Sequence, residues 1–482
     1  MLVLSTARDT WLLFSHPVAV GADGYYYVLQ VNALLKTHHL YFPTYTPLVF
    51  YVLAGLSILT RNAVLAIKLG SIGFNIALSL GVFFLVSSIC RNRWLGVLGA
   101  AITTLSGMHF YMIAEFIKNL AGVTLFIWGA QCAIRASTKH EARWIALTVV
   151  LVISALLSHA SLWGIVPALF VLVLLAKYSI SRPRSKLIVV FGVILLLILP
   201  ALLAFQKVVG LPPWLGSELL IRPRWPISFS SPVGKAEMIA LLVTAPTTLF
   251  LIVRHWSALP GNAFGEVVSA VALWSLLVNL NPFLNHDVRQ LGIIGRLDHL
   301  IYLQVAIILP ALIWLSLRIN RKLSGSLLAM TFCFMAASIA APFPKGLQPR
   351  YLTERQQLIQ ALPEYRQQLG TNPLVIAQHG DEFVITWVLG IPAQQNFSTI
   401  SPTRSAYWLL HQVNPMTLTR ATIVVMEENN GSGLVLMKHD DLAQWLDRIG
   451  PAERDRLFSQ NPHLKEYVDD ESKDRFPSMF RQ

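Results

Sequence analysis

Side chains that can transfer protons or bind phosphate recur in the polar breaks of this otherwise apolar chain. A carboxylate can accept the proton of a hydroxyl group, and a histidine can act as acid or base. Lysine and arginine bind phosphate oxygens, arginine in a bidentate geometry. An enzyme working at the outer face of a membrane would need this combination. The residues of these types that lie in the breaks expected on one side of the membrane are Asp23, Glu115, Lys118, His159, Arg222, Arg224, Asp287, Arg289, Arg296 and Asp298.

Asp23 lies in the segment GADGYYY, just before the apolar stretches. A carboxylate there could be a general base, a metal ligand or the partner of a cation. An Asp before a Gly is also common in ordinary turns, and the two interpretations are about equally matched. Tyr25 and Tyr26 follow as candidate substrate-binding residues, although tyrosines also gather at membrane interfaces for structural reasons.

A second group lies in the segment AEFIKNLAG at the junction of two apolar stretches. Glu115 and Lys118 are three residues apart, which predicts a shared helix face, and Asn119 is adjacent. Ionisable residues at a membrane border favour a function, but an ion pair with a lysine reaching to the interface also explains them. His159 could line a cavity, although a lone histidine is more often structural.

Arginines form the third group. Arg222 and Arg224 lie in IRPRWP, and Arg296 is followed by Asp298 at the start of a late apolar stretch. Each arginine could hold a lipid phosphate or simply anchor a helix at the interface. The pair His38 and His39 has no fitting third ligand nearby, so no metal site is predicted, and a divalent cation such as Mg²⁺ or Mn²⁺ stays an open alternative.

Composition indicates that these residues are positioned by a membrane domain. Hydrophobic residues make up 54% of the 482-residue chain and charged residues only 13%, too apolar for a soluble protein of this length. The net charge of +13 does not indicate nucleic-acid binding, because much of it lies in short loops between apolar stretches. The expected spans are 63–90, 94–113, 117–135, 143–158, 160–177, 187–206, 236–254, 263–281, 298–317 and 324–341.

The charge of the loops predicts the orientation. If residues 1–62 lie outside, every inside loop is basic, as membrane topology usually requires. The segment 45–60 is too short for a span and fits an interfacial helix. With the N-terminus outside and no span before it, either a first helix is missing from this sequence or the N-terminus is translocated unaided, and we favour the first interpretation. The basic residues assigned to the inside are Arg91, Arg93, Arg135, Lys139, Arg143, Lys177, Arg182, Arg184, Lys186, Arg254, Arg318, Arg321 and Lys322.

The composition changes near Pro342, after which no apolar span occurs. Residues 373–376 and 422–426 resemble buried strands, and 352–369 and 440–449 resemble amphipathic helices. The expected organisation is an external segment 1–62, a polytopic helical membrane domain 63–341 and a small α/β domain 342–482 outside the cytoplasm, with a disordered tail after about residue 462.

Several of these segments resemble one known family. The segments GADGYYYVLQ, YFPTYTPLVFYVL, EFIKNLAG and GRLDHLIYLQ are similar to bacterial membrane glycosyltransferases of the GT-C superfamily, over most of residues 15–341. Relatives in that superfamily include protein mannosyltransferases and lipid A aminoarabinose transferases. The WWDxG motif of oligosaccharyltransferases is absent, and the first loop has one acid rather than a pair.

The resemblance implies transfer of a sugar from a polyprenyl-phosphate donor to a glycan, lipid or protein acceptor, in the inner (plasma) membrane and on its outer face. Asp23 would then be the base that orients the acceptor, Arg296 would hold the phosphate, and Glu115 and Lys118 would line the cavity. A transporter or lipid flippase, and a non-enzymatic assembly protein of the cell envelope, are the alternatives. A transporter would place ionisable groups in broken helices near the bilayer midplane.

Overall fold

The computed structural model describes residues 2–159, 235–255, 262–280, 300–319, 321–340, 343–395, 405–414, 423–427 and 432–465, with a few isolated positions between them. These residues form two compact units. One, the membrane unit, comprises residues 1–12, 43–52 and 69–344. The other, the mixed unit, comprises residues 13–42, 53–68 and 345–482. The mixed unit thus joins a segment near the N-terminus to the C-terminal domain.

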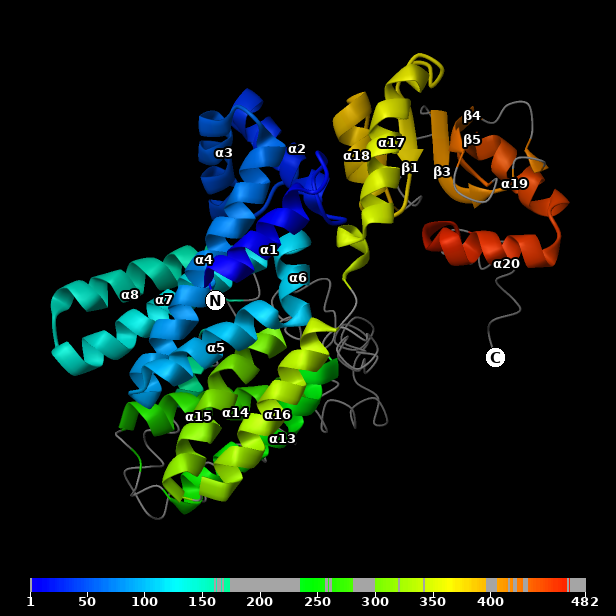
Figure 1. Ribbon diagram of the computed structural model, residues 1–482. Coiled ribbons are helices and arrows are strands. Elements are labelled where there is room, and N and C mark those ends of the chain that lie inside the picture. The colour runs from blue at the N-terminus through cyan, green and yellow to red at the C-terminus, as the bar shows by residue number, and fades with distance from the viewer. Residues whose placement is uncertain are drawn as a thin grey trace, which may run out of the picture. The chain divides into compact units, whose positions relative to one another are not determined.

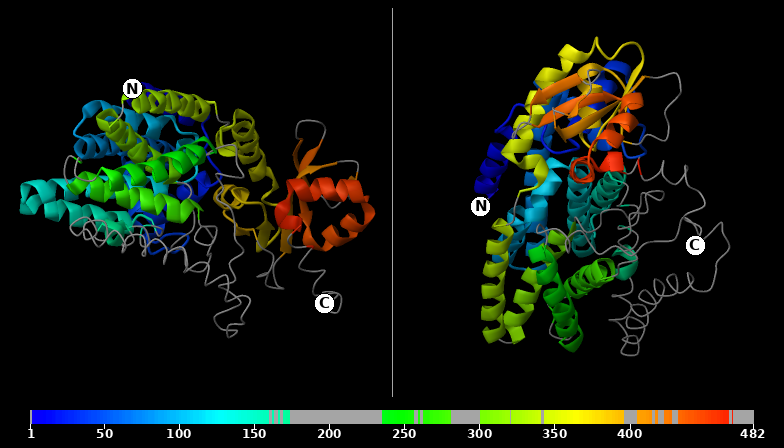
Figure 2. Two further views of the ribbon diagram at one scale, coloured as in Figure 1. Left: turned by 90° about the horizontal axis from the view of Figure 1, so that it is seen from below. Right: turned by 90° about the vertical axis from the view of Figure 1, so that its right-hand side faces the viewer.

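The helices of the first half of the chain agree with most of the expected spans. They are α1 (Leu2–Phe14), α2 (Gly24–Thr37), α3 (Leu48–Thr60), α4 (Ala63–Cys90), α5 (Arg93–Leu105), α6 (Gly107–Ala114), α7 (Ile117–Lys139) and α8 (Ala142–Leu156). The antiparallel pair α7 and α8 lies side by side in Figures 1 and 2. The short apolar helix α3 occupies the segment expected at the interface.

Further apolar helices follow the central part of the chain. They are α13 (Lys235–Arg254), α14 (Asn262–Leu280), α15 (Ile301–Ile319) and α16 (Arg321–Ile339). Among the described residues, five helices are long and apolar enough to cross a membrane, or six if one bent pair counts as a span. The expected span 187–206 and most of 160–177 lie outside the described residues.

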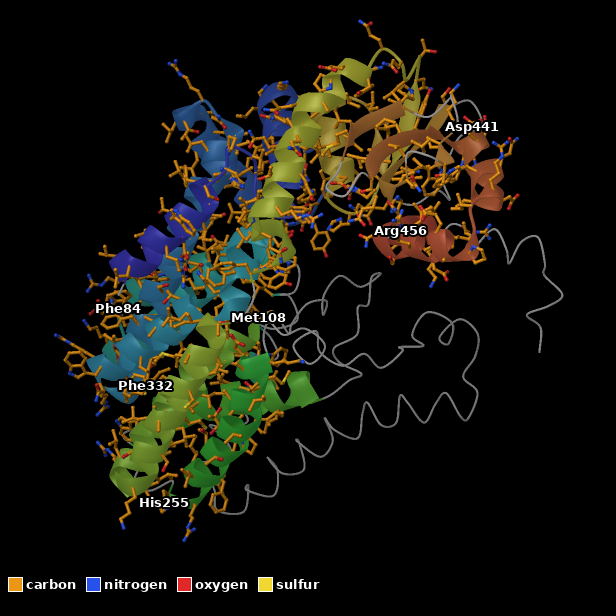
Figure 3. The ribbon with its side chains drawn as sticks, turned by 45° about the vertical axis from the view of Figure 1, so that its right-hand side comes forward. Phe84, Met108, His255, Phe332, Asp441 and Arg456 are labelled. Carbon is orange, nitrogen blue, oxygen red and sulfur yellow. The ribbon has the colours of Figure 1, made fainter. Side chains whose placement is uncertain are left out.

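The α-helical polytopic fold is confirmed by where the apolar side chains lie. Helix α15 is enclosed by its neighbours, because 89% of its most apolar 18-residue stretch is buried. Outer helices instead expose large apolar side chains, such as Ile145 on α8 and Phe332 on α16 (Figure 3). Exposed apolar surface on helices whose backbone groups are bonded internally is suited to lipid rather than water.

The expected single span 94–113 is wrong in one respect, because the chain bends by 64° between α5 and α6. Ser106 ends α5 and begins α6, and its hydroxyl oxygen accepts a hydrogen bond from the amide of Met108 at 3.1 Å. A serine that caps a new helix allows the chain to change direction there. A hydropathy profile cannot show such a bend, because both helices are apolar.

The C-terminal part contains the expected α/β domain. Its helices are a short 3₁₀ turn η4 (Lys345–Leu347), α17 (Pro349–Tyr365), α18 (Asp381–Leu389), α19 (His439–Arg448) and α20 (Pro451–Gln460). Its strands are β1 (Pro373–Ile376), β2 (Ala393–Gln394), β3 (Ser405–Val413), β4 (Ile423–Glu427) and β5 (Gly433–Lys438), in the order β2-β1-β3-β5-β4. Strand β1 is parallel to β2 and β3, and β5 is antiparallel to β3 and β4.

Side chains alternate along the strands, so the core of this domain has one layer on each face of the sheet. Trp408 and Leu410 of β3 and Met437 of β5 pack with Trp445 of α19 and Leu457 of α20 on one face of the sheet. Helices α17 and α18 cover the other face (Figure 1). Helices therefore cover the sheet on both sides. The polar side chains of the sheet discussed below lie at strand ends and at irregular positions of the strands.

Candidate functional site

In the mixed unit, Asp23 lies against the α/β domain. Asp23 is the N-cap residue of α2, and its Oδ1 is 3.0 Å from Nε2 of His379. The Nδ1 of His379 is 3.2 Å from Oε1 of Glu382 on α18. Nε2 of Gln395 donates to the same Oε1 of Glu382 at 2.6 Å. The side chain of Asp23 is 17% exposed, so the carboxylate remains accessible from one side.

The two carboxylates determine the charge of His379. The hydrogen bonds to Asp23 and then to Glu382 raise the pKa of His379 to about 10, against the opposing effect of partial burial. The imidazole is therefore doubly protonated at neutral pH and donates from both ring nitrogens. A carboxylate with an imidazolium on one side and an accessible face on the other can orient a hydroxyl group and accept its proton.

A second, more deeply buried cluster holds the loop that carries Asp23. Arg355 of α17 donates from Nη1 to the carbonyl of Gly21 at 3.1 Å, and its Nη2 is 3.3 Å from Asp381 Oδ1. His411 Nε2 is 2.8 Å from the other oxygen, Asp381 Oδ2. Burial alone would raise the pKa of Asp381, but the bond from His411 and the charges of His411 and Arg355 hold it well below its usual range.

Glycines allow the loop to approach the domain closely. Gly380 has a φ of +99°, and a Cβ added there would lie 3.1 Å from the carbonyl oxygen of Ala22. The amide of Gly21 also donates to the carbonyl of Gly346 at 3.1 Å. The rings of Tyr25 and Trp387 are 4.9 Å apart, and those of Tyr26 and Phe383 are 5.4 Å apart. Backbone and aromatic contacts thus fix Asp23 relative to α18.

Other sequence-predicted residues belong to the membrane unit. Lys118 Nζ lies 3.5 Å from Oγ1 of Thr44 and 5.2 Å from the centre of the Phe50 ring. Gly122, one turn further along α7, approaches His159 so closely that an added Cβ would lie 3.1 Å from the Cβ of His159. Lys118 and His159 are therefore placed along the same side of α7.

The expectation that Glu115 and Lys118 share one helix face is wrong. Glu115 is the C-cap of α6, whereas Lys118 belongs to α7, and Phe116 between them has φ −124° and ψ 52°. The three-residue spacing therefore does not place them on one helical surface. Glu115 is 9% exposed and the adjacent Asn119 is 7% exposed, so both are buried. Arg222, Arg224, Asp287, Arg289, Arg296 and Asp298 lie outside the described residues.

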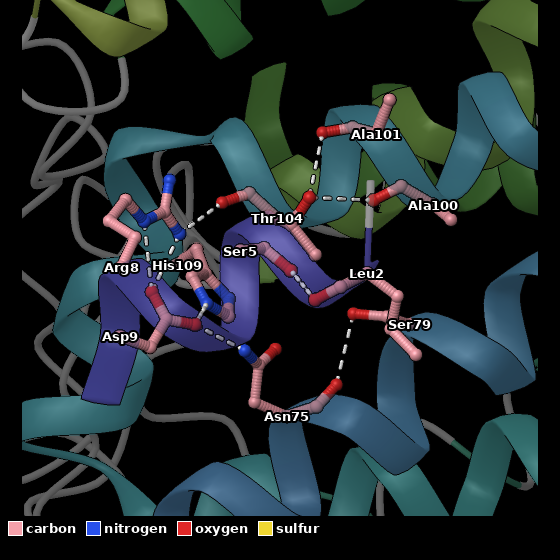
Figure 4. A network of polar contacts seen from close by, with 10 residues as sticks. All are labelled: Leu2, Ser5, Arg8, Asp9, Asn75, Ser79, Ala100, Ala101, Thr104 and His109. Carbon is pink, nitrogen blue, oxygen red and sulfur yellow. Dashed lines mark hydrogen bonds and ion pairs between the residues drawn. The ribbon is translucent and has the colours of Figure 1, made fainter. Parts of the chain in front are cut away.

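The membrane unit also contains a buried polar network that the sequence analysis did not identify. Asp9 of α1 accepts from Arg8 Nη2 at 2.7 Å and from Asn75 Nδ2 of α4 at 2.5 Å, with His109 Nε2 at 3.4 Å (Figure 4). Glu237 of α13, 1% exposed, accepts from Ser106 at the bend between α5 and α6. Buried carboxylates with several donors are expected to lock the helices that contribute them.

Among the described residues, no three His, Cys, Asp or Glu side chains gather in a geometry that could hold a metal ion. Asp23 has the imidazole of His379 as its partner at 3.0 Å.

Fold and site together define a helical membrane protein with an α/β domain, against which lies an N-terminal loop with an accessible carboxylate. No protein-family model matches the chain, and no curated protein matches it. Solved structures that are similar to it include two glycosyltransferases. The apo oligosaccharyltransferase of Archaeoglobus fulgidus has 12% identity and a TM-score of 0.49, over 81% of this chain and 64% of that one. Apo ArnT from Cupriavidus metallidurans has 15% identity and a TM-score of 0.42, over 90% and 97%.

This chain thus spans less than two thirds of the length of the archaeal oligosaccharyltransferase. With both TM-scores below 0.5, no residue role is transferred from either structure.

Proposed function

We propose that this protein is a membrane glycosyltransferase that moves a sugar from a polyprenyl-phosphate donor to an acceptor hydroxyl group on the outer face of the inner membrane. The observation that carries the proposal is the ion pair between Asp23 and His379, which orients an accessible carboxylate in the loop singled out by the sequence. The resemblance of four sequence segments to the GT-C superfamily supports the same class of reaction.

In the proposed reaction, Asp23 accepts the proton of the acceptor hydroxyl group. The freed oxygen attacks the anomeric carbon of the sugar, and the bond from that carbon to the phosphate oxygen breaks. The electron pair leaves with the polyprenyl phosphate, whose charge needs cationic partners at the membrane interface. A single carboxylate acting as base without a covalent intermediate would invert the anomeric configuration.

The residues proposed to bind the donor are Lys118, Asn119 and His159 of the membrane unit, together with Arg222, Arg224, Arg296 and Asp298. A donor anchored in the bilayer cannot leave it, so its phosphate has to be bound where the membrane meets water. Holding the donor and the acceptor together supplies much of the rate in such a transfer. Glycan, lipid and protein acceptors are all compatible with a hydroxyl nucleophile.

The test is sugar transfer in membranes supplied with labelled polyprenyl-phosphate sugars. We expect Asp23→Asn to reduce transfer by about 10²-fold or more, because it removes the base while keeping the shape. The matched control is Asp447→Asn, which changes an exposed carboxylate on α19 and should leave transfer unchanged. Normal transfer by a correctly inserted Asp23→Asn protein would refute the assigned role of Asp23.

One observation favours transport as a second candidate. The apolar pair α5 and α6 bends by 64° at a short break, as a broken span or a re-entrant loop does, and the buried carboxylate of Glu237 accepts from Ser106 at that break. Broken helices with polar groups are found at ion and substrate sites of transporters. Proteoliposomes would separate the two functions. Uptake of a labelled substrate that is lost in Glu237→Gln but kept in Asp23→Asn would establish transport instead of transfer.

A further inference from the structure

A polar cleft in the mixed unit is lined in part by Arg355 and Asp381, the pair that also holds the loop of Asp23. Its volume is about 440 Å³, within the range of small-molecule sites, which is roughly 300–1,000 Å³. Four glutamines line it, together with Tyr351, the buried side chains of Arg355 and Asp381, and the partly exposed side chain of His411. The glutamines are Gln348, Gln378, Gln412 and Gln460.

The charges of the cleft largely offset each other. Asp381 faces both Arg355 and His411, and Arg350 donates from Nε to Glu354 at 2.8 Å. The lining is therefore rich in hydrogen-bonding groups without a strong net charge. Primary amides both donate and accept, and a tyrosine ring offers an apolar face. This combination suits a neutral molecule with many hydroxyl groups better than it suits a phosphate or a cation.

An irregularity in the sheet presents two of these side chains. The pairing of β3 with β5 shifts register between Leu410 and Val413, so His411 and Gln412 both leave the regular alternation. Gln412 has a φ of +55°, a conformation that costs a non-glycine residue about 1–3 kcal/mol. Bulges commonly redirect side chains next to functional sites, and strained residues cluster there.

We propose that this cleft binds a saccharide and that it is the subsite for the sugar portion of the acceptor. The role in acceptor binding rests on the glycosyltransferase function proposed above, whereas saccharide binding itself does not. The Arg355 guanidinium links the two places, because Nη2 pairs with Asp381 at the base of the cleft and Nη1 holds the carbonyl of Gly21 beside Asp23. Saccharide binding thus stabilises the loop that presents the carboxylate.

Saturation-transfer-difference NMR on the full chain tests the binding. The protein is placed in nanodiscs, since maltoside detergents would themselves compete, and lactose, maltotriose and chitotriose are the probes, without any donor. We expect transfer to at least one of them. Gln412→Ala and Gln460→Ala should each weaken that binding by about two- to tenfold, as the loss of one neutral hydrogen bond predicts. Gln357→Ala is the matched control, an exposed amide on α17 outside the cleft.

Hydrogen exchange tests the link to the loop. The amides of residues 19–24 should exchange more slowly with the bound saccharide in the wild type, and this protection should be reduced in Gln460→Ala at the same saccharide concentration. Absence of saturation transfer to all three probes, or binding that Gln412→Ala and Gln460→Ala leave unchanged, would overturn the proposal. Saccharide binding in a protein with no transferase activity would instead reject the proposed function and leave the cleft assignment standing.

Discussion

The Asp23 carboxylate is oriented by residues that lie far along the chain. The side chain of its partner His379 is 49% exposed, so the ion pair is screened by water and contributes little to stability by itself. Its main effect is orientation, because the imidazolium is held between Asp23 and Glu382 and cannot rotate without losing one of them.

The charge state of His379 gives a prediction about pH. Its pKa is 6.5 in an unfolded chain and about 10 in the folded one, so folding binds the proton more tightly. The stabilisation is fully present below about pH 6.5 and is lost as the pH rises through about 10. We therefore expect His379→Ala to lower the melting temperature most at pH 6, and progressively less between pH 6.5 and 10. The measurement is a thermal melt in nanodiscs at each pH.

The control for this prediction is His39→Ala, which removes an exposed histidine outside the network. It should show no comparable pH dependence. A destabilisation by His379→Ala that stays constant from pH 6 to 10 would contradict the assignment of an imidazolium bound by two carboxylates.

At the scale of the elements, α18 is the piece that brings the loop and the α/β domain together. It follows β1 through the segment Gln378–Gly380, and its first turn carries Asp381 and Glu382. The two neighbouring acids act in different places, Asp381 at the base of the cleft and Glu382 beside His379. Successive residues of a helix point in different directions, so one helix start can serve two sites.

Gly380 tests how closely the loop has to approach this helix. Gly380→Ala should destabilise the mixed unit by about 2–4 kcal/mol, because the strain of a positive φ is added to a contact with Ala22 and Arg355. Gly370→Ala is the matched comparison, since Gly370 also has a positive φ, +72°, but open space around it. We expect it to cost only about 1 kcal/mol. Equal effects in chemical denaturation would show that the loop does not depend on the contact.

Several elements were predictable from the sequence, because the hydrophobic pattern alone determines them. Strand β1 coincides with the predicted 373–376, and α4 with the predicted 63–90. The pairing of Asp23 with His379 was not predicted, and neither was the bond from Arg355 to Gly21, since the latter two are 334 residues apart and no periodicity links such distant segments. One signal was present, namely the polar run Gln378–Glu382 directly after a buried parallel strand, where ligand sites commonly lie.

At the scale of the whole molecule, the proposed chemistry is divided between the two units. Asp23 and the cleft belong to the mixed unit, and Lys118 and His159 belong to the membrane unit. The mixed unit itself combines residues 13–42 with residues that follow the last described membrane helix. Its site is therefore completed only after the α/β domain has been synthesised, because long-range contacts form late in a large chain. Activity should depend on both ends of the sequence being present.

The orientation of the spans leads to a prediction for the intact molecule. The turn between α7 and α8 belongs to the basic loops expected inside, and the α/β domain is expected outside. Single cysteines can be placed at exposed positions, Thr138→Cys at the end of α7 next to that turn and Asp447→Cys on α19, in a background with Cys90, Cys132 and Cys333 replaced by alanine.

A membrane-impermeant maleimide should label the cysteine at position 447 in spheroplasts and the one at position 138 only after lysis. The Cys-free background should stay unlabelled throughout. The opposite pattern would place the α/β domain in the cytoplasm. Asp23 belongs to the same compact unit as that domain, so this result would also exclude a reaction on the outer face.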